Sequence, residues 1–546
     1  MVDTQGSAPD RRRSRALAAL QDERFDILVI GGGSIGAGIA LHASARGLRV
    51  ALVEKDDFGS GTSSRSTKLA HGGVRYLERA VTRADIGEYR LVREALRERA
   101  AFFRLAPYLS RPIAILAPAY SPRDRLYYSA GLHLYDLLAG TDSLGRTRYL
   151  RAAEAQALFP ALNGRGLSGA VLYYDGQFDD ARLNVALAVT ASALGATVVN
   201  HACARRLVRE SERIAGAEVE DTLTGERATV RAAVVINAAG PQADLVRALA
   251  DPGAPSLLQV SRGIHIVLGP GRFPGETGLL IPKTPDGRVV FVLPWLGHTL
   301  IGTTDGPAEP SDHPPVPPGD VDYLLQQVNR YLVDPVKRAD IRSNWSGLRP
   351  LVRDPQRQRT AELRRGHVIT EGPAGLVTVA GGKWTTYRRI AEDAVTAVVL
   401  RHGLRARPAA AAREQPLVGA ERFSTGFVAE VERRYRLGAE LAGHLGRSYG
   451  DRLEGVCALM EAGHGGRLAP GHPYVDAEVL WAVREEMAQT VMDVLARRTR
   501  LAFLDRAAAR QATPRIADLM AEELGWSDAR RATELAVTGT LLDGDL

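Results

Sequence analysis

The sequence predicts an α/β fold with a second domain built on a mixed sheet and an all-helical C-terminal domain. A strand, a glycine turn, a helix and a second strand follow one another between residues 25 and 54. Short β-type runs recur over residues 255–350, and from about residue 405 onward the apolar spacing becomes helical. Because 546 residues are too many for a single core, we expect two or three domains.

The glycine turn at residues 31–36 reads Gly-Gly-Gly-Ser-Ile-Gly and fits the pattern GxGxxG between a strand and a helix. In that pattern Gly31 permits the tight turn, Gly33 lets the backbone approach a pyrophosphate, and Gly36 lets helix and strand pack closely. Glu54 closes the second strand, where an acidic side chain can bind ribose hydroxyls. A plain glycine turn is the alternative for the motif alone. With its flanking strands and Glu54, it predicts a Rossmann-like dinucleotide-binding domain.

The segment that follows the second strand favours FAD over NAD. An NAD domain continues at once with further strand–helix repeats. Here a polar loop rich in Ser, Thr and Gly runs from residue 59 to residue 73. Its hydroxyls and backbone amides are suited to wrapping a second segment of a prosthetic group, although a polar surface loop is an equal alternative.

Composition and charge restrict the classes of partner. The formal net charge of +7 is compatible with an anionic substrate or an anionic membrane surface, and the dispersed arginines argue against nucleic acid. Two cysteines, Cys203 and Cys457, cannot make a disulfide framework, and no Cys/His cluster predicts a metal site. No stretch approaches about 18 uninterrupted apolar residues, so we expect any membrane contact to be peripheral.

Longer motifs resemble a specific family. Residues 63–78 fit SSxSxKLxHGGxRYLE, which is similar to a signature of the FAD-dependent, quinone-linked glycerol-3-phosphate dehydrogenases, a branch of the D-amino-acid-oxidase-like flavoproteins. Further similar blocks stand in order along the chain, at residues 173–183, 237–241, 262–265, 294–295, 301–305, 346–351, 381–388 and 482–503. The resemblance covers about residues 25–530.

The resemblance implies oxidation of sn-glycerol 3-phosphate to dihydroxyacetone phosphate, with hydride transfer from C2 to FAD and electrons passed to a membrane quinone. FAD is expected to be bound non-covalently, since no His or Cys stands in a recognised flavinylation motif. The predicted FAD-binding domain comprises residues 25–85, 150–250 and 350–400. A substrate domain over residues 86–149 and 251–349, a helical domain over 401–546 and a flexible tail over 1–24 complete the predicted organisation.

Site residues follow from the motif and from the resemblance. The predicted cofactor-binding residues are Gly31, Gly33, Ser34, Gly36, Glu54, Thr62, Ser63, Ser66, Lys68, Leu69, His71, Gly240, Gly382, Lys383, Trp384 and Thr385. A phosphate dianion needs fixed cations, preferably the planar forks of arginines. The predicted substrate-binding residues are Arg75, Tyr76, Arg349, Arg365 and Lys383. Apolar, glycine-rich text surrounds Arg349 and Lys383, where a buried cation without a partner would be costly.

The reaction also needs a base for the C2 hydroxyl, and histidine suits that role near neutral pH. His265 lies in an apolar strand, where the pattern alone favours a core histidine bonded to a carbonyl. The resemblance instead implies that His265 is the base at the substrate face, with Arg349 as a second catalytic residue and His71 as the alternative base.

Residues 121–140 predict a basic, aromatic, amphipathic helix that can lie in a membrane interface, with an ordinary buried helix as the alternative. Together with sparse cysteine usage, this predicts a cytoplasmic protein held peripherally on the inner face of the cell membrane. The oligomeric state stays open, with a homodimer as one candidate.

Three other functions are alternatives to the dehydrogenase. An oxidase of the same family would carry a sizeable insertion in the substrate region, which is not seen. A non-catalytic flavin-binding protein would be expected to lose His265 or the phosphate-binding cations, all of which are present. An amino-acid oxidase of the wider superfamily would not need so many cations. The sequence therefore favours a dehydrogenase.

Overall fold

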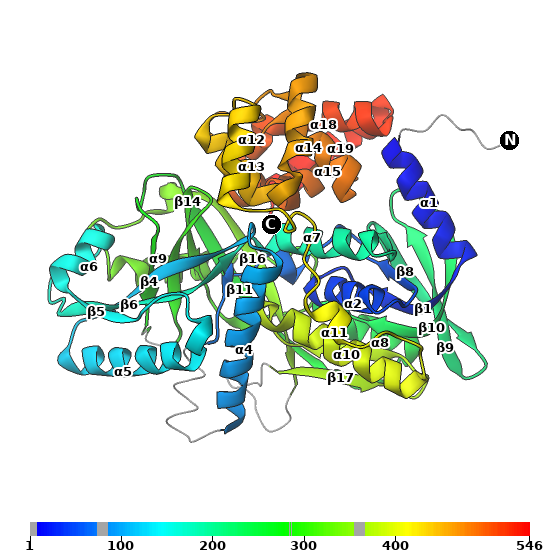
Figure 1. Cartoon of the computed structure of the whole chain (residues 1–546), viewed down its shortest axis with the longest axis horizontal. Helices are drawn as coiled ribbons and strands as arrows, with labels where there is room; N and C mark the ends of the chain where they lie inside the picture. The colour runs from blue at the N-terminus through cyan, green and yellow to red at the C-terminus, as the bar shows by residue number, and fades with distance from the viewer. Residues whose placement is uncertain (1–7, 74–85, 283, 285–286, 354–365, 546) are drawn as a thin grey trace.

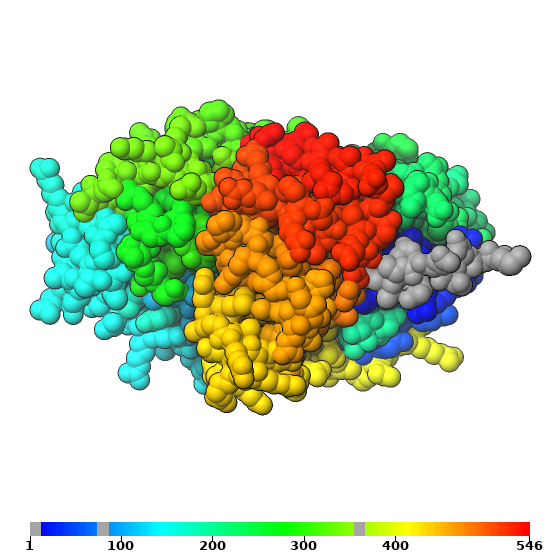
Figure 2. All heavy atoms as spheres, turned by 90° about the horizontal axis from the view of Figure 1, so that it is seen from above, coloured from blue at the N-terminus to red at the C-terminus, as the bar shows by residue number. Residues whose placement is uncertain are grey.

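The computed structural model describes residues 8–73, 86–282, 284, 287–353 and 366–545. Within these ranges the chain forms two sheets with their covering helices, and a helical domain lies above both (Figure 1). Seen from above, the helices of the C-terminal domain, coloured yellow to red, cover the middle of the molecule (Figure 2).

The first sheet has the order β17-β18-β10-β1-β2-β7, and β8 and β9 extend it beside β10. β1 pairs in parallel with both β10 and β2, and its residues from Phe25 to Ile30 are nearly all buried, as in a sheet covered on both faces. The strands are β1 (Arg24–Ile30), β2 (Val50–Val53), β7 (Thr197–Val199), β8 (Ala202–Glu210), β9 (Arg213–Asp221), β10 (Arg227–Asn237), β17 (His367–Glu371) and β18 (Val377–Gly381).

Helices α2 (Ser34–Ala45), α7 (Asp180–Ala193) and α10 (Tyr387–His402) pack together against this sheet, and α8 (Ala243–Ala250) follows β10. The parallel strands β1, β2 and β10 end at one edge, which is where ligands bind in such sheets. The predicted strand–turn–helix–strand unit is therefore confirmed as β1, α2 and β2.

The second sheet is mixed, as predicted, because β12 pairs in parallel with β4 whereas the other ladders are antiparallel. Its strands are β3 (Leu69–Ala70), β4 (Ser110–Ala119), β5 (Arg148–Arg151), β6 (Gly169–Phe178), β11 (Leu258–Leu268), β12 (Thr277–Ile281), β13 (Val290–Trp295), β14 (His298–Gly302), β15 (Gly306–Pro307) and β16 (Ile341–Val352). Its helices are α4 (Ile86–Leu105), α5 (Pro122–Ala139), α6 (Ala152–Leu158) and α9 (Pro318–Asn329).

The predicted domain boundary at residue 150 is wrong. β6 pairs with β4 along its whole length and also with β3 and β5, so the chain stays in the second sheet until Phe178. The apolar sequence of β6 is compatible with a buried strand of either sheet. Only its pairing partners show that β6 belongs to the second sheet.

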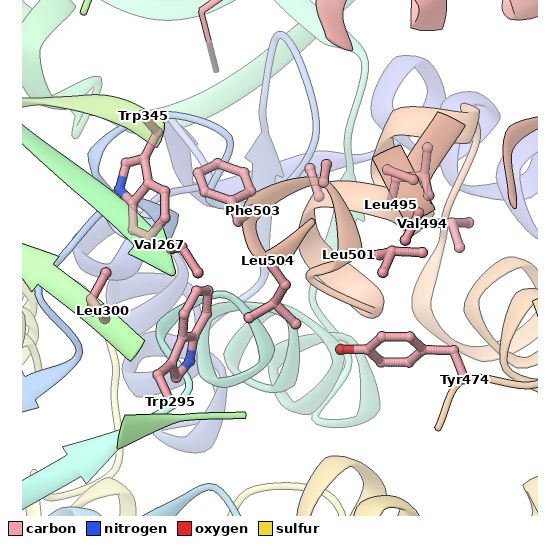
Figure 3. Packing of buried hydrophobic residues seen from close by; sticks show 14 of the residues in the cluster. Val267, Trp295, Leu300, Trp345, Tyr474, Val494, Leu495, Leu501, Phe503 and Leu504 are labelled. Carbon is pink, nitrogen blue, oxygen red and sulfur yellow. The ribbon is translucent and has the colours of Figure 1, made fainter. Parts of the chain in front are cut away.

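The C-terminal domain is helical, as predicted, and one apolar core joins it to the second sheet. Phe503 and Leu504 lie against Trp345 and Trp295 (Figure 3), with ring centroids of Trp345 and Phe503 5.0 Å apart. Burying a side chain such as Phe503 stabilises the fold by about 1.5–3 kcal/mol. The helices are α11 (Ala410–Arg413), α12 (Thr425–Arg434), α13 (Ala439–Tyr449), α14 (Leu453–Leu459), α15 (Asp476–Glu486), α16 (Val491–Asp493), α17 (Leu501–Leu504), α18 (Arg506–Leu524) and α19 (Asp528–Asp543).

The predicted flexible tail is wrong for α1 (Ala8–Asp22). Leu20 of this helix is fully buried, and the Arg13 guanidinium donates to the Asp221 carboxylate at 2.9 Å. The apolar face of α1 is short in the sequence, and its docking partners lie about the first sheet, far along the chain. The local sequence therefore did not predict that α1 packs beside the first sheet.

Candidate active site

A cavity of about 1660 Å³ opens at the carboxyl edge of the first sheet. Its lining joins the glycine motif and the loop at residues 59–73 to β11 and β16 of the second sheet, and it reaches residues 490–503 of the helical domain. Small-molecule sites commonly occupy about 300–1,000 Å³. The cavity thus has room for a large cofactor beside a small substrate.

The glycines of the motif have different tasks. Gly31 has φ +111°, and a Cβ there would lie 2.6 Å from the Ala238 carbonyl oxygen. A Cβ on Gly36 would overlap the carbonyl oxygen of Gly31. Gly33 instead lines the cavity, and its nearest neighbour would be the Ser63 hydroxyl, at 3.1 Å. Gly31 and Gly36 therefore shape the turn, whereas Gly33 keeps the cavity open.

Glu54 stabilises the same turn. Its carboxylate accepts from the backbone N–H of Gly32 at 2.6 Å and from that of Asp56 at 3.0 Å. Burial raises the pKa of this carboxyl to about 7. Nearby, the Ser63 hydroxyl accepts from the Ser34 N–H at 2.9 Å, at the start of α2. The predicted cofactor residues of β2, α2 and the polar loop thus meet at one edge.

His265 lies on β11 and lines the cavity. Its Nε2 is 2.9 Å from the Thr67 hydroxyl, and its ring stacks on Trp345 with centroids 5.4 Å apart. Nδ1 is buried and has no hydrogen-bond partner in the part of the chain that the structure describes. The contact with the Thr67 hydroxyl replaces the carbonyl bond of an ordinary core histidine.

Burial holds the pKa of His265 well below 6.5, and the positive charges of Lys68 and Arg349 lower it further. The imidazole is therefore neutral at neutral pH and is able to accept a proton.

Arg349 lies on β16 beside this histidine, with its side chain 24% exposed. Its guanidinium contacts the Asp305 carboxylate at 3.3 Å and donates to the Thr303 hydroxyl at 3.1 Å. A Cβ on Gly263 would overlap the guanidinium, so only glycine at that position leaves room for it. Asp305, on a strand connection 44 residues earlier, is thus a partner of Arg349 within the protein, so this cation is not left unpaired in the fold.

Two segments of the chain match known protein families. Residues 26–388 match the family described as FAD dependent oxidoreductase, and residues 410–531 match the C-terminal domain of alpha-glycerophosphate oxidase. Over 542 residues the chain is 44% identical to the mitochondrial glycerol-3-phosphate dehydrogenase of Bos taurus, and the match covers 96% of this chain and 74% of that protein. The chain belongs to the FAD-dependent glycerol-3-phosphate dehydrogenase family.

Other members of this family agree. The mitochondrial glycerol-3-phosphate dehydrogenase SDP6 of Arabidopsis thaliana is 42% identical over 556 residues, which are 98% of this chain and 88% of that protein. The crystal structure of the glycerol-3-phosphate dehydrogenase from Bacillus halodurans, complexed with FAD, superposes with a TM-score of 0.80 at 29% identity and covers 98% of both chains. FAD as the cofactor and the predicted fold class are thereby confirmed.

The residues present fit FAD. The predicted cofactor residues that line the cavity are Gly31, Gly33, Ser34, Glu54, Thr62, Ser63, Ser66, Leu69, His71, Gly240, Gly382, Lys383, Trp384 and Thr385. A glycine without a Cβ at the cavity wall and a helix N-terminus beside it are the features that a pyrophosphate needs. Trp384 fixes the polar loop from the other side, since its indole N–H donates to the Ser63 carbonyl at 2.8 Å.

The sequence predicts that Lys68 binds the cofactor, but its side chain does not line the cavity. Its ammonium group is fully buried outside the described cavity lining and donates to Asp180 at 2.8 Å and to the Ser64 carbonyl at 3.1 Å. Burial lowers the pKa of Lys68 to about 8, and Asp180 opposes that shift. The side chain holds the loop in place, which the sequence did not reveal because Asp180 lies 112 residues away.

Among the predicted substrate-binding residues, Arg349 and Lys383 both line the cavity. Arg75, Tyr76 and Arg365 lie outside the described residues. Sequence reasoning missed Thr67 and Thr303, although each stands inside a motif that carried the resemblance. It also missed Arg65, Arg123 and Arg288 as cations that line the cavity, although Arg65 stands in the motif of residues 63–78 and Arg123 in the predicted basic helix.

Proposed function

We propose that this protein oxidises sn-glycerol 3-phosphate to dihydroxyacetone phosphate. The observation that carries the proposal is the neutral His265 beside Arg349 in the cavity that the glycine motif lines. The names of the relatives at 44% identity support the same substrate. FAD, when bound, supplies the acceptor for the hydride that leaves C2.

In the proposed reaction Nε2 of His265 takes the proton of the C2 hydroxyl. The Thr67 hydroxyl, 2.9 Å from that nitrogen, holds the ring in place. A hydroxyl both donates and accepts, so Thr67 can turn its hydrogen away from Nε2, leaving the one lone pair of that nitrogen for the C2 hydroxyl proton, and then accept from the N–H that forms. Trp345 stacks on the ring and restricts its rotation. General-base catalysis of this kind contributes about 10²- to 10⁴-fold to a rate.

The phosphate of the substrate is proposed to bind Arg349 and Lys383, two cations that line the cavity. Arg75, Arg365 and the hydroxyl of Tyr76 stay predictions, because they lie outside the described residues. The planar guanidinium of Arg349 suits phosphate oxygens, and the Asp305 and Thr303 contacts fix its position.

Arg349→Ala is expected to raise KM and to lower kcat/KM by about tenfold or more, the effect of losing charge-assisted bonds to phosphate. Anaerobic titration with glycerol 3-phosphate, followed by bleaching of the flavin, measures substrate binding and reduction together. Arg342→Ala is the control, because Arg342 is an exposed cation on the same strand and does not line the described cavity. Plain glycerol should bleach the wild-type flavin very poorly, and equal bleaching by glycerol would refute the phosphate site.

We further propose that a membrane quinone accepts the electrons and that the protein is held peripherally on the inner face of the cell membrane. α5 supports this, because Leu132 and Tyr135 are buried whereas Leu126 and Leu137 are 74% and 76% exposed. Leu126 and Tyr127 also line the cavity, so this helix joins an apolar surface to the active site. In the described ranges, no helix has the length and apolar character needed to cross a bilayer.

Leu137→Glu is expected to weaken binding to anionic vesicles, measured by co-sedimentation, while leaving activity towards soluble quinone analogues intact. Wild-type binding should weaken as salt rises, because charge attraction is screened over about 10 Å at 0.1 M. Leu400→Glu, on α10, is a matched control, since Leu400 is also 76% exposed. An absence of wild-type binding at low salt, or equal losses in both variants, would count against α5 as the membrane surface.

A further inference from the structure

Buried charged side chains from distant parts of the chain meet beneath the loop at residues 63–68. Lys68 and Asp180 have fully buried side chains, and that of Arg500 is 1% exposed. Asp180 begins α7, and Arg500 immediately precedes α17 of the helical domain. Arg500 contacts Asp180 at 3.2 Å, and Lys68 contacts the other carboxylate oxygen at 2.8 Å.

This cluster holds the backbone of the loop at two points. The Ser64 carbonyl accepts from Arg500 at 2.7 Å and from Lys68 at 3.1 Å. Two residues later, both the backbone N–H and the hydroxyl of Ser66 donate to Asp180, at 3.0 and 2.8 Å. The helical domain therefore bonds directly to the backbone of a loop in the active site.

The same loop forms part of the cavity wall through Ser63, Ser66 and Thr67. Thr67 is the residue whose hydroxyl contacts Nε2 of His265. Arg500 also contacts the histidine indirectly through aromatic rings. Its guanidinium lies 4.6 Å from the ring centroid of Phe503, and Phe503 packs on Trp345 (Figure 3). His265 stacks on that same Trp345 ring.

Stability is a weak explanation for this cluster. Taking charged groups out of water is costly, and apolar side chains of similar volume often stabilise a core at least as well as buried ion pairs do. What the cluster provides is a defined position for the loop, because each charge has a fixed partner on it.

We propose that Arg500 is a positioning residue that makes the helical domain a functional part of the active site. It holds residues 63–68 so that Ser63 and Ser66 stay in the wall of the cavity proposed for FAD and Thr67 contacts His265. Arg500 is not among the described residues that line the cavity, so it acts through the loop. The expected effect on the rate of flavin reduction rests on the proposed function, because it is measured with glycerol 3-phosphate. The expected effect on FAD affinity does not, because FAD binding requires no substrate.

The test uses Arg500→Met in the full chain, with the free energy of FAD binding measured by titrating the apoprotein with FAD and following flavin fluorescence. We expect affinity for FAD to fall by about tenfold or more, the effect of losing hydrogen bonds to a charged group. In the FAD-loaded variant, reduction at saturating glycerol 3-phosphate should also slow by about tenfold. The guanidinium of Arg500 bonds the Ala496 carbonyl through Nη1 and Ser64 and Asp180 through Nη2. Arg500→Lys keeps the charge but loses one of these two nitrogens, so partial recovery is expected.

Arg182→Met is the matched control. Arg182 lies on α7, as Asp180 does, and is nearly as buried as Arg500. Its guanidinium connects that helix to the helical domain through Glu486 at 2.7 Å and the Ser448 carbonyl at 2.8 Å. In the described structure no hydrogen bond or ion pair joins Arg182 to residues 63–68. This variant should lower Tm while leaving FAD affinity and the reduction rate unchanged.

The proposal is wrong if the Arg500 variants lower Tm as Arg182→Met does but bind FAD and react like the wild type. It is also wrong if Arg182→Met weakens FAD binding as much as Arg500→Met. Should Arg500→Met not fold, Arg500→Lys and Asp180→Asn carry the same comparison. A protein that binds FAD normally but does not oxidise glycerol 3-phosphate would refute the proposed substrate, and the FAD titrations would still decide the role of Arg500.

Discussion

His265→Ala is expected to slow flavin reduction by about a hundredfold to ten-thousandfold, the usual contribution of a general base. Substrate binding should change much less, because the cations proposed to hold the phosphate remain. Anaerobic stopped-flow at saturating substrate measures the reduction step directly. The matched control is His298→Ala, since His298 is a buried histidine on the adjacent strand β14 and does not line the described cavity.

The pH dependence of this step has a definite sign. Protonated His265 cannot act as a base, and burial with Lys68 and Arg349 nearby holds its pKa well below 6.5. The wild-type rate should therefore be flat near neutral pH and should fall only as pH drops through that lowered pKa. His265→Ala should lose this acid limb. If the variant reduced its flavin at the wild-type rate with the same pH profile, His71, which also lines the cavity, would become the candidate base.

Gly33→Val is expected to abolish binding of a non-covalently held FAD while leaving the protein folded. Gly33 has φ −73°, which any L-residue adopts, and the nearest atom to a new Cβ is the Ser63 hydroxyl at 3.1 Å. The rest of the valine side chain must extend into the cavity, where it blocks the approach of a pyrophosphate. The ratio of flavin to protein absorbance after purification measures the loss, and circular dichroism measures the fold.

Two other glycines serve as comparisons for Gly33→Val. Gly319→Ala should retain FAD, since a Cβ at that position meets nothing within 4 Å. Gly36→Val should instead damage the fold itself, because its side chain would collide with the Gly31 carbonyl inside the turn. A Gly33→Val protein with full flavin absorbance would remove the glycine motif from the cofactor site.

Local patterns in the sequence predicted the elements that depend on backbone geometry alone. The apolar run, glycine turn and small-residue helix appear as β1 and α2, and the helix expected at residues 121–140 appears as α5. A strand buried on both faces is a short continuous apolar run, and an amphipathic helix repeats its apolar positions about every 3.6 residues, so a short stretch of sequence contains the signal.

Local patterns do not predict which side chains from distant parts of the sequence contact one another. Thr67 and His265 are 198 residues apart, and Arg500 and Ser64 are 436 apart, yet each pair is in hydrogen-bond contact. The sequence indicated a histidine base, but the lowered pKa that makes its ring neutral depends on burial and on the charge of Lys68.

The sequence by itself determined the dinucleotide-binding unit, the helical character of the C-terminal domain and, through its resemblance to a family, a set of site residues of which those described, except Gly36 and Lys68, line the cavity. The tertiary structure decided that β6 belongs to the second sheet, that α1 docks, and that Lys68 supports the loop and does not face the cavity. The physical reason is the range of the interactions. Backbone hydrogen bonding and glycine sterics act between near neighbours, whereas sheet pairing, ion pairing and desolvation depend on which distant segments the folded chain brings together.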